Sequence, residues 1–312
     1  MVDHHRGHAD HLRPAVDRLL AVSTPVRAKL HARWHQVEKD PLMPLPTIGA
    51  AVQMRDMDAL QDWIFTADRP IEIQDFVGAE VIAGDVSDLV AAWRTRLDGH
   101  RGPRGIHGPF FGLDLSNPDR AIRDIIAARL IKGVEIAAQL GADVMVVHSP
   151  FNFWHKLNYA NYSFLRPGLM DACAECLAPV LDRAAGEGVT LVLENIDDTD
   201  PADRGDLVTR IGHANLKLSV DTGHADLAHA NYGAPPVVDV LGAAGEQLAH
   251  VHLQDVDGHA DRHWHPGDGR IHWRPVMEHL AGLGDPARLI LEVRAKLHRL
   301  PETADRLARL AA

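Results

Sequence analysis

Short apolar runs rich in β-branched residues alternate with longer helical patterns from residue 46 onward. This alternation is typical of βαβ units, in which helices join parallel strands. The expected strands are 46–53, 70–76, 104–110, 143–149, 190–196, 216–222, 248–254 and 288–294. Eight units in one continuous stretch predict an α/β fold of the closed (β/α)8 type, the TIM barrel. A doubly wound sheet would usually have fewer strands and a Gly-rich first turn, and the first turn here has no GxGxxG.

Helical patterns fill the gaps between the expected strands, and several of them begin at Asp or Pro and stop at Gly, as helix caps do. They cover 58–65, 85–97, 118–140, 166–185, 202–211, 234–245 and 273–283, with 302–312 closing the chain. We therefore expect a barrel domain over 46–312 and an N-terminal helical extension over 1–45. The extension could cover its own barrel or a partner subunit, so a homo-oligomer stays open.

Composition limits the classes of molecule that such a barrel could bind. Hydrophobic residues make up 46% of the chain and charged residues 24%, the balance of a globular protein with a large core. The formal net charge of −11 opposes the binding of phosphate backbones, so we expect no nucleic-acid partner. The chain has no apolar run of about 18 residues and no signal-peptide core at its N-terminus, which predicts a cytoplasmic protein that does not enter membranes.

Metal-ligating side chains occupy six of the eight expected strand ends, where a TIM barrel builds its active site. They are His107, His148, Glu194, Asp221 with His224 just after it, His252 and Glu292. A single His or Glu at a strand end would mean little in a chain with 21 histidines. Converging carboxylates, however, repel one another and lose water unless a cation compensates them. The pattern therefore predicts a divalent metal site.

Five sequence strings at consecutive strand ends carry a resemblance: VLENID, SVDTGHADLA, HVHLQD, DRHWHPGDG and ILEV. In this order they resemble the xylose-isomerase-like TIM barrels. That superfamily contains sugar and sugar-phosphate isomerases and epimerases, and also endonuclease IV. The resemblance covers about residues 46 to 294 and not the N-terminal extension.

The resemblance to the ketose epimerases and inosose isomerases implies one Mn²⁺, Co²⁺ or Zn²⁺ ion. Its ligands would be Glu194, Asp221, His252 and Glu292, and His224 would contact a substrate oxygen. The metal would stabilise an enediolate while Glu194 and Glu292 act as acid and base. We thus expect a divalent-metal-dependent isomerase or epimerase for a small carbohydrate or a cyclic polyol ketone.

Two alternatives stay open within the same superfamily. Endonuclease IV holds three Zn²⁺ ions for phosphodiester cleavage, and its pattern adds His107, His148, His224, Asp261 and His263 as ligands, so up to three ions are compatible with the sequence. A lyase resembling 3-dehydroshikimate dehydratase is the other alternative. Ketose 3-epimerases typically carry an arginine six residues after the metal-binding histidine, where this chain has Gly258.

Three further residues are candidates for substrate binding. Phe153 and Trp154 follow the fourth expected strand, and their rings could stack on the apolar face of a sugar. Arg294 lies near the last strand end, within reach of a substrate phosphate. The identity of the substrate does not follow from the sequence.

Overall fold

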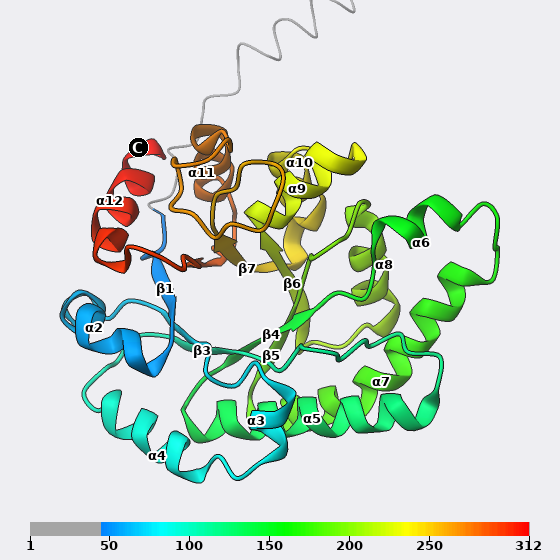
Figure 1. Cartoon of the computed structure of the whole chain (residues 1–312), viewed down its shortest axis with the longest axis horizontal. Helices are drawn as coiled ribbons and strands as arrows, with labels where there is room; N and C mark the ends of the chain where they lie inside the picture. Colours follow the sequence, from blue (N-terminus) through cyan, green and yellow to red (C-terminus); the bar gives the residue numbers. More distant parts are fainter. Residues whose placement is uncertain (1–44, 312) are drawn as a thin grey trace, which may run out of the picture. The chain divides into compact units, whose positions relative to one another are not determined.

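The computed structural model describes residues 45–311, and eight parallel strands close into one barrel in sequence order (Figure 1). The strands are β1 (Gly49–Val52), β2 (Ile71–Ile73), β3 (Arg104–His107), β4 (Val144–His148), β5 (Thr190–Glu194), β6 (Leu216–Asp221), β7 (Leu248–Leu253) and β8 (Arg288–Leu291). Each lies inside an expected strand, so the predicted TIM barrel is confirmed. The expected extension falls almost wholly on residues 1–44, which lie outside the described residues.

Helices lie outside the ring of strands (Figure 1). They are α2 (Met57–Thr66), α3 (Ala79–Ala83), α4 (Ser87–Arg96), α5 (Arg120–Gln139), α6 (Phe153–Asn158), α7 (Leu165–Glu187), α8 (Pro201–Ile211), α9 (Thr222–Tyr232), α10 (Val237–Ala244), α11 (Trp273–Ala281) and α12 (Leu300–Leu310). All eight expected helices are present. Among the helices of residues 45–311, none has the length and apolarity that crossing a membrane requires.

The predicted caps are real. The side chain of Asp200 accepts a hydrogen bond from Ala202 N at the start of α8, and Pro201 occupies the first turn, where its missing N–H costs nothing. Gly188 and Gly212 end α7 and α8 in the left-handed conformation, which glycine adopts without steric cost. These caps limit the helices, so that each following strand enters the barrel in register.

The short helix α3 after β2 was not expected, and two segments near later strand ends also differ from the expected pattern. The stretch after β4, expected as a loop, contains the short helix α6, whose first turn is capped because Asn152 Oδ1 accepts from His155 N. The helix α9 was not expected at all, and it begins immediately after β6 without an intervening loop. Asp221 both ends the strand and caps the helix, since its Oδ1 accepts from His224 N at 2.7 Å.

The strand register places the site. Residues paired across neighbouring parallel strands project to the same side of the sheet. His148 pairs with Glu194, and Asp221 pairs with His252. The apolar core lies mainly between the strands and the helices, whereas the interior-facing side chains of β7 include two buried histidines, His250 and His252. The chain thus directs its polar residues toward one end of the barrel.

Candidate metal centre

Four buried donors converge at the carboxyl ends of the last four strands. Glu194 ends β5, Asp221 ends β6, His252 lies in β7, and Glu292 follows β8. One ligand atom from each lies within 4.8 Å of the others. None of the four side chains belongs to a residue more than 5% exposed. The structure therefore brings together the four residues that the sequence proposes as metal ligands.

The spacing and the unpaired oxygens in this cluster suit a divalent cation. His252 Nδ1 lies 2.7 Å from Glu194 Oε1 and 3.4 Å from Glu292 Oε2. Ligand atoms of a tetrahedral ion at about 2.1 Å would be about 3.4 Å apart. Glu194 Oε2 and Asp221 Oδ2 are buried without a hydrogen-bond partner among residues 45–311. Because buried polar atoms rarely stay unpaired, the donor set fits a metal ion.

Burial and neighbouring charges shift the pKa values of this cluster. Burial raises the pKa of Asp221 above its usual range. Burial alone would lower the pKa of His252, but the carboxylates of Glu72, Glu292 and Glu194 raise it well above its ordinary value. Without a metal, the imidazolium of His252 would therefore balance part of the negative charge, which a divalent cation would balance more completely.

Two further clusters flank the central one. In the first, His107 Nε2 and His148 Nε2 each lie 3.6 Å from Glu194 Oε2 and 3.2 Å from each other. In the second, Asp261 lies 3.5 Å from His224 Nε2 and 2.9 Å from His263 Nε2. Burial, followed by the charge of His107, lowers the pKa of His148 to about 3, which keeps it in the neutral form that binds metals.

Backbone carbonyls fix the orientation of three histidines in the flanking clusters. Nδ1 of His107 lies 2.9 Å from Gly108 O, and Nδ1 of His224 lies 2.9 Å from Asn195 O. Nδ1 of His263 lies 3.1 Å from Glu292 O. A carbonyl only accepts, so each Nδ1 carries a proton and Nε2 is the atom left for a metal, which would displace any proton there. All three Nε2 atoms face the neighbouring donors of their clusters.

Two glutamines that sequence reasoning missed hold the carboxylates in place. Gln254 Nε2 donates to Asp221 Oδ1 at 3.1 Å and to Asp261 Oδ1 at 2.9 Å, and so joins the central cluster to a flanking one. Gly223 makes room for this carboxamide, which a Cβ at residue 223 would overlap. Gln74 Nε2 donates to Glu292 Oε1 at 2.6 Å. Their only sequence signal is their place just after β7 and β2.

The loop from 255 to 272 is anchored by a carboxylate of its own. The buried Asp255 accepts hydrogen bonds from Gly267 N at 2.7 Å and from Trp273 Nε1 at 2.8 Å. Trp273 is therefore bound into the core and is not available for a substrate. The anchor fixes the path of the segment that carries Asp261 and His263.

A cavity of about 320 Å³ opens beside the clusters and is lined by Glu194, Glu292 and Arg294. Phe110 and Phe111, which the sequence reasoning did not single out, supply its aromatic surface. Phe153 stacks on Tyr232 with ring centroids 4.4 Å apart, and Trp154 stacks on Tyr162. Neither Phe153 nor Trp154 is among the lining residues of this cavity.

The fold and the acidic and histidine side chains at the strand ends agree with a known protein family. Residues 71–311 match the xylose isomerase-like TIM barrel family, and this chain belongs to it. The expected superfamily is thus confirmed.

One of the curated relatives that the chain matches is a sugar epimerase. D-Psicose 3-epimerase of Ruminiclostridium cellulolyticum is 27% identical over 192 residues, which are 60% of this chain and 61% of that protein. The chain spans about 60% of the length of the curated relatives that it matches.

Solved structures extend the likeness over most of the barrel. TTHB071 protein from Thermus thermophilus, soaked with ZnCl2, is 26% identical with a TM-score of 0.65, over 85% of this chain and 98% of that one. A D-tagatose 3-epimerase-like protein has a TM-score of 0.69 and 20% identity over the same shares, a likeness of fold alone.

Proposed function

We propose that this protein is a divalent-metal-dependent isomerase or epimerase of a sugar or a cyclic polyol ketone. The observation that carries the proposal is the buried cluster of Glu194, Asp221, His252 and Glu292 beside a cavity lined by both glutamates. The cavity volume of about 320 Å³ lies at the small end of the range for small-molecule sites. The family and the similarity to D-psicose 3-epimerase support a sugar as the substrate.

The four residues of the central cluster would hold one ion of Zn²⁺, Mn²⁺ or Co²⁺, and the soak of the similar TTHB071 protein with ZnCl2 is consistent with zinc among these ions. When bound, such an ion polarises a substrate carbonyl and stabilises the negative charge that develops when the adjacent carbon loses its proton.

Glu194 and Glu292 would move that proton. One carboxylate would take it from the carbon beside the carbonyl, and the other would return a proton to the product. Gln74 Nε2 donates to Glu292 Oε1 at 2.6 Å and so fixes the orientation of this carboxylate. Glu194 Oε2 is without a hydrogen-bond partner among residues 45–311.

Other residues would bind and orient the substrate. His224 Nε2 would contact a substrate oxygen, since Nδ1 is held by Asn195 O. Arg294 lines the cavity and would bind a substrate hydroxyl or phosphate. Phe153 and Trp154 would contact only parts of a substrate that extend beyond the cavity.

Exchange of carbon-bound protons with solvent tests this proposal. Metal-loaded protein incubated in D2O with a panel of ketoses and cyclic polyol ketones should introduce deuterium beside the carbonyl, as measured by NMR. Glu194→Gln and Glu292→Gln should each lower the exchange rate by roughly 10²- to 10⁴-fold. Exchange with none of the compounds would contradict the proposed class, and full exchange by both variants would refute the roles of the two glutamates.

Metal-assisted phosphodiester hydrolysis is a second candidate, favoured by the three adjacent donor clusters. Glu194 belongs to two of the clusters, so two ions could share it. The net charge of −11 argues against a nucleic-acid substrate. Among residues 45–311, Arg294 is also the one Lys or Arg side chain that lines the cavity.

Metal content separates the two candidates. About three zinc ions per chain together with cleavage of an abasic-site duplex would favour the hydrolase. Proton exchange on a ketone without cleavage of the duplex would favour the isomerase.

A further inference from the structure

A buried carboxylate in β2, Glu72, contacts two histidines of β7 on the far side of two intervening strands, β1 and β8. We propose that Glu72 is a positioning residue for the metal centre: it holds the Nε2 proton of His252 and so leaves His252 Nδ1 as the atom that binds the metal. The inference rests on the proposed metal centre and not on the reaction that the centre performs.

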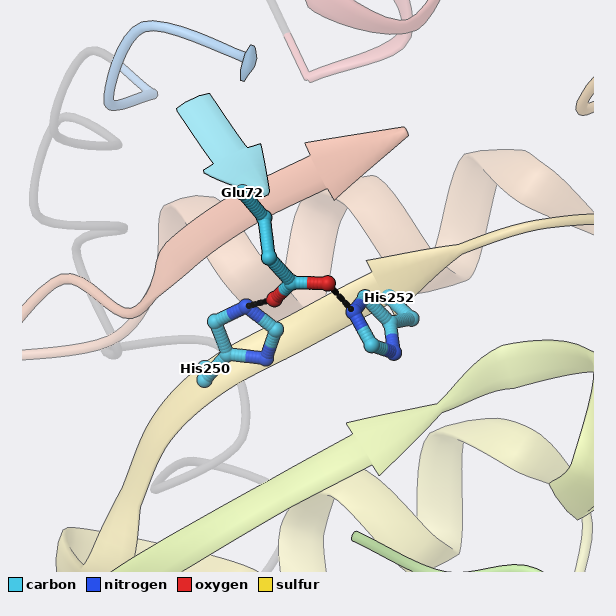
Figure 2. A group of neighbouring side chains, drawn as sticks. All are labelled: Glu72, His250 and His252. Atoms are coloured by element: carbon cyan, nitrogen blue, oxygen red, sulfur yellow. Dashed lines mark hydrogen bonds and ion pairs between the residues drawn. The ribbon is translucent and has the colours of Figure 1, made fainter. Parts of the chain in front are cut away.

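The contacts of Glu72 carry the inference. Figure 2 shows its carboxylate between the rings of His250 and His252. Glu72 Oε1 lies 2.9 Å from His252 Nε2, and Glu72 Oε2 lies 3.1 Å from His250 Nε2. Glu72 and His250 are 1% exposed, and His252 is fully buried. These contacts are therefore shielded from bulk solvent.

The two nitrogens of His252 have different partners. Nε2 faces Glu72, whereas Nδ1 faces the central cluster, 2.7 Å from Glu194 Oε1 and 3.4 Å from Glu292 Oε2. An ionised carboxylate only accepts hydrogen bonds, so Nε2 must carry the proton. The lone pair that a metal requires is then on Nδ1, once a metal has displaced any proton there.

His252 is oriented differently from the histidines of the flanking clusters. In His107, His224 and His263 a backbone carbonyl holds Nδ1 and leaves Nε2 for the cluster. In His252 the ring is reversed: Nδ1 faces the cluster, and Nε2 contacts the Glu72 side chain in place of a backbone carbonyl. A carboxylate is a stronger acceptor than a carbonyl and also increases the basicity of the ligand nitrogen.

His250 and Ser219 hold Glu72 in turn. Ser219 Oγ lies 2.9 Å from His250 Nδ1. The carboxylate 3.1 Å from His250 Nε2 favours the tautomer with the proton on Nε2, in which Nδ1 accepts the hydroxyl proton of Ser219. The chain Ser219, His250, Glu72, His252 therefore has one consistent arrangement of protons, which ends at the metal centre.

Metal affinity tests the inference directly. The dissociation constants of Zn²⁺ and Co²⁺ would be measured for the full chain by chelator competition, with the ligand-field absorption of Co²⁺ as a report on the coordination geometry. Glu72→Ala should weaken binding of both ions by roughly 10- to 100-fold and alter the Co²⁺ spectrum. Glu72→Gln keeps an oxygen that can accept from His252 Nε2 but loses the charge, so its affinity should fall between those of Glu72→Ala and the wild type.

Asp75→Asn is the matched control. Asp75 lies three residues further along the same segment and accepts from Met54 N and Trp93 Nε1, without contact to a cluster histidine. This variant should keep the wild-type metal affinity. Wild-type affinity and an unchanged Co²⁺ spectrum in the Glu72 variants would overturn the inference, and Glu72→Gln decides alone if Glu72→Ala does not fold. Failure of the wild type to bind either ion would instead overturn the metal centre itself.

Discussion

Replacement of Arg204 by methionine should destabilise the barrel strongly, because this side chain ties together the two strands that carry Glu194 and Asp221. Arg204 is 1% exposed, and its Nη1 donates to Leu193 O at 2.9 Å and to Ser219 O at 2.6 Å. Its Nε lies 3.1 Å from the buried Asp198 Oδ1. Methionine fills a similar volume but leaves the Asp198 carboxylate without its cationic partner and removes the donor to the two carbonyls, although Ser149 Oγ and Ile196 N still donate to Asp198.

The size of the effect follows from these contacts. Removal of one partner of a buried ion pair costs about 3–5 kcal/mol of unfolding free energy. In a domain of roughly this size, each kcal/mol lowers Tm by about 2–4 °C, so calorimetry should show a loss of roughly 6–20 °C. Arg183→Met is the control, since Arg183 pairs with Glu135 and Glu187 at the surface and such pairs contribute about 1 kcal/mol or less.

The pH dependence gives a second check on the same variant. Burial raises the pKa of Asp198 to about 6 even beside Arg204. The folded state therefore holds this proton more tightly than the unfolded chain, and the contribution of Asp198 to stability decreases as the pH rises through about 4 to 6. Without Arg204 the charged carboxylate is less favourable still, so Arg204→Met should cost less at about pH 5 than at about pH 8. A loss below about 1 kcal/mol, or an equal loss at both pH values, would refute this reasoning.

Further predictions concern the metal centre and its loop. Zn²⁺ affinity should fall as the pH is lowered, because Zn²⁺ must displace a proton from His252, whose pKa is lowered by burial but raised further by the surrounding carboxylates. Calorimetric titration in buffers of different ionisation enthalpy should detect proton release on Zn²⁺ binding. Binding without proton release would contradict the prediction. Gly223→Ala should displace Gln254, lower the free energy of unfolding by about 1–3 kcal/mol and weaken Zn²⁺ binding. An unchanged Zn²⁺ affinity would show that the position of Gln254 does not matter for metal binding. Asp255→Asn should lower the free energy of unfolding by roughly 1–3 kcal/mol, since an amide nitrogen cannot accept from Trp273 Nε1. The loop from 255 to 272 should then become more sensitive to protease than in the wild type. Equal proteolysis of the two proteins would oppose the anchoring role.

The order of strands and helices followed from the sequence because local periodicity and caps determine it. The strand 190–194 has an apolar centre, residues 191–193, and follows a helix that is capped by Gly188, and these signals need no tertiary information. The helix α9 was missed for the opposite reason. Asp221 completes a strand and caps a helix at once, so no turn residues separate the two elements.

The candidate site was predictable where strand ends define it and not where contacts cross the barrel. His148 and Glu194 could be placed side by side because the strands that carry them are neighbours in a parallel barrel. Glu72 is a single acidic residue between two isoleucines, and its partners lie on β7, which closure of the barrel brings near. The role of Gln254 could likewise not be predicted from the sequence, since it depends on the space that Gly223 leaves.

An anomalous-scattering map of crystals soaked with ZnCl2 would test the central claim most directly. The account predicts a strong peak among Glu194, Asp221, His252 and Glu292, at about 2.0–2.2 Å from His252 Nδ1 and from the carboxylate oxygens. Further peaks at the two flanking clusters would favour the hydrolase candidate. A map with no peak among these four residues, from protein shown to be folded, would contradict the account.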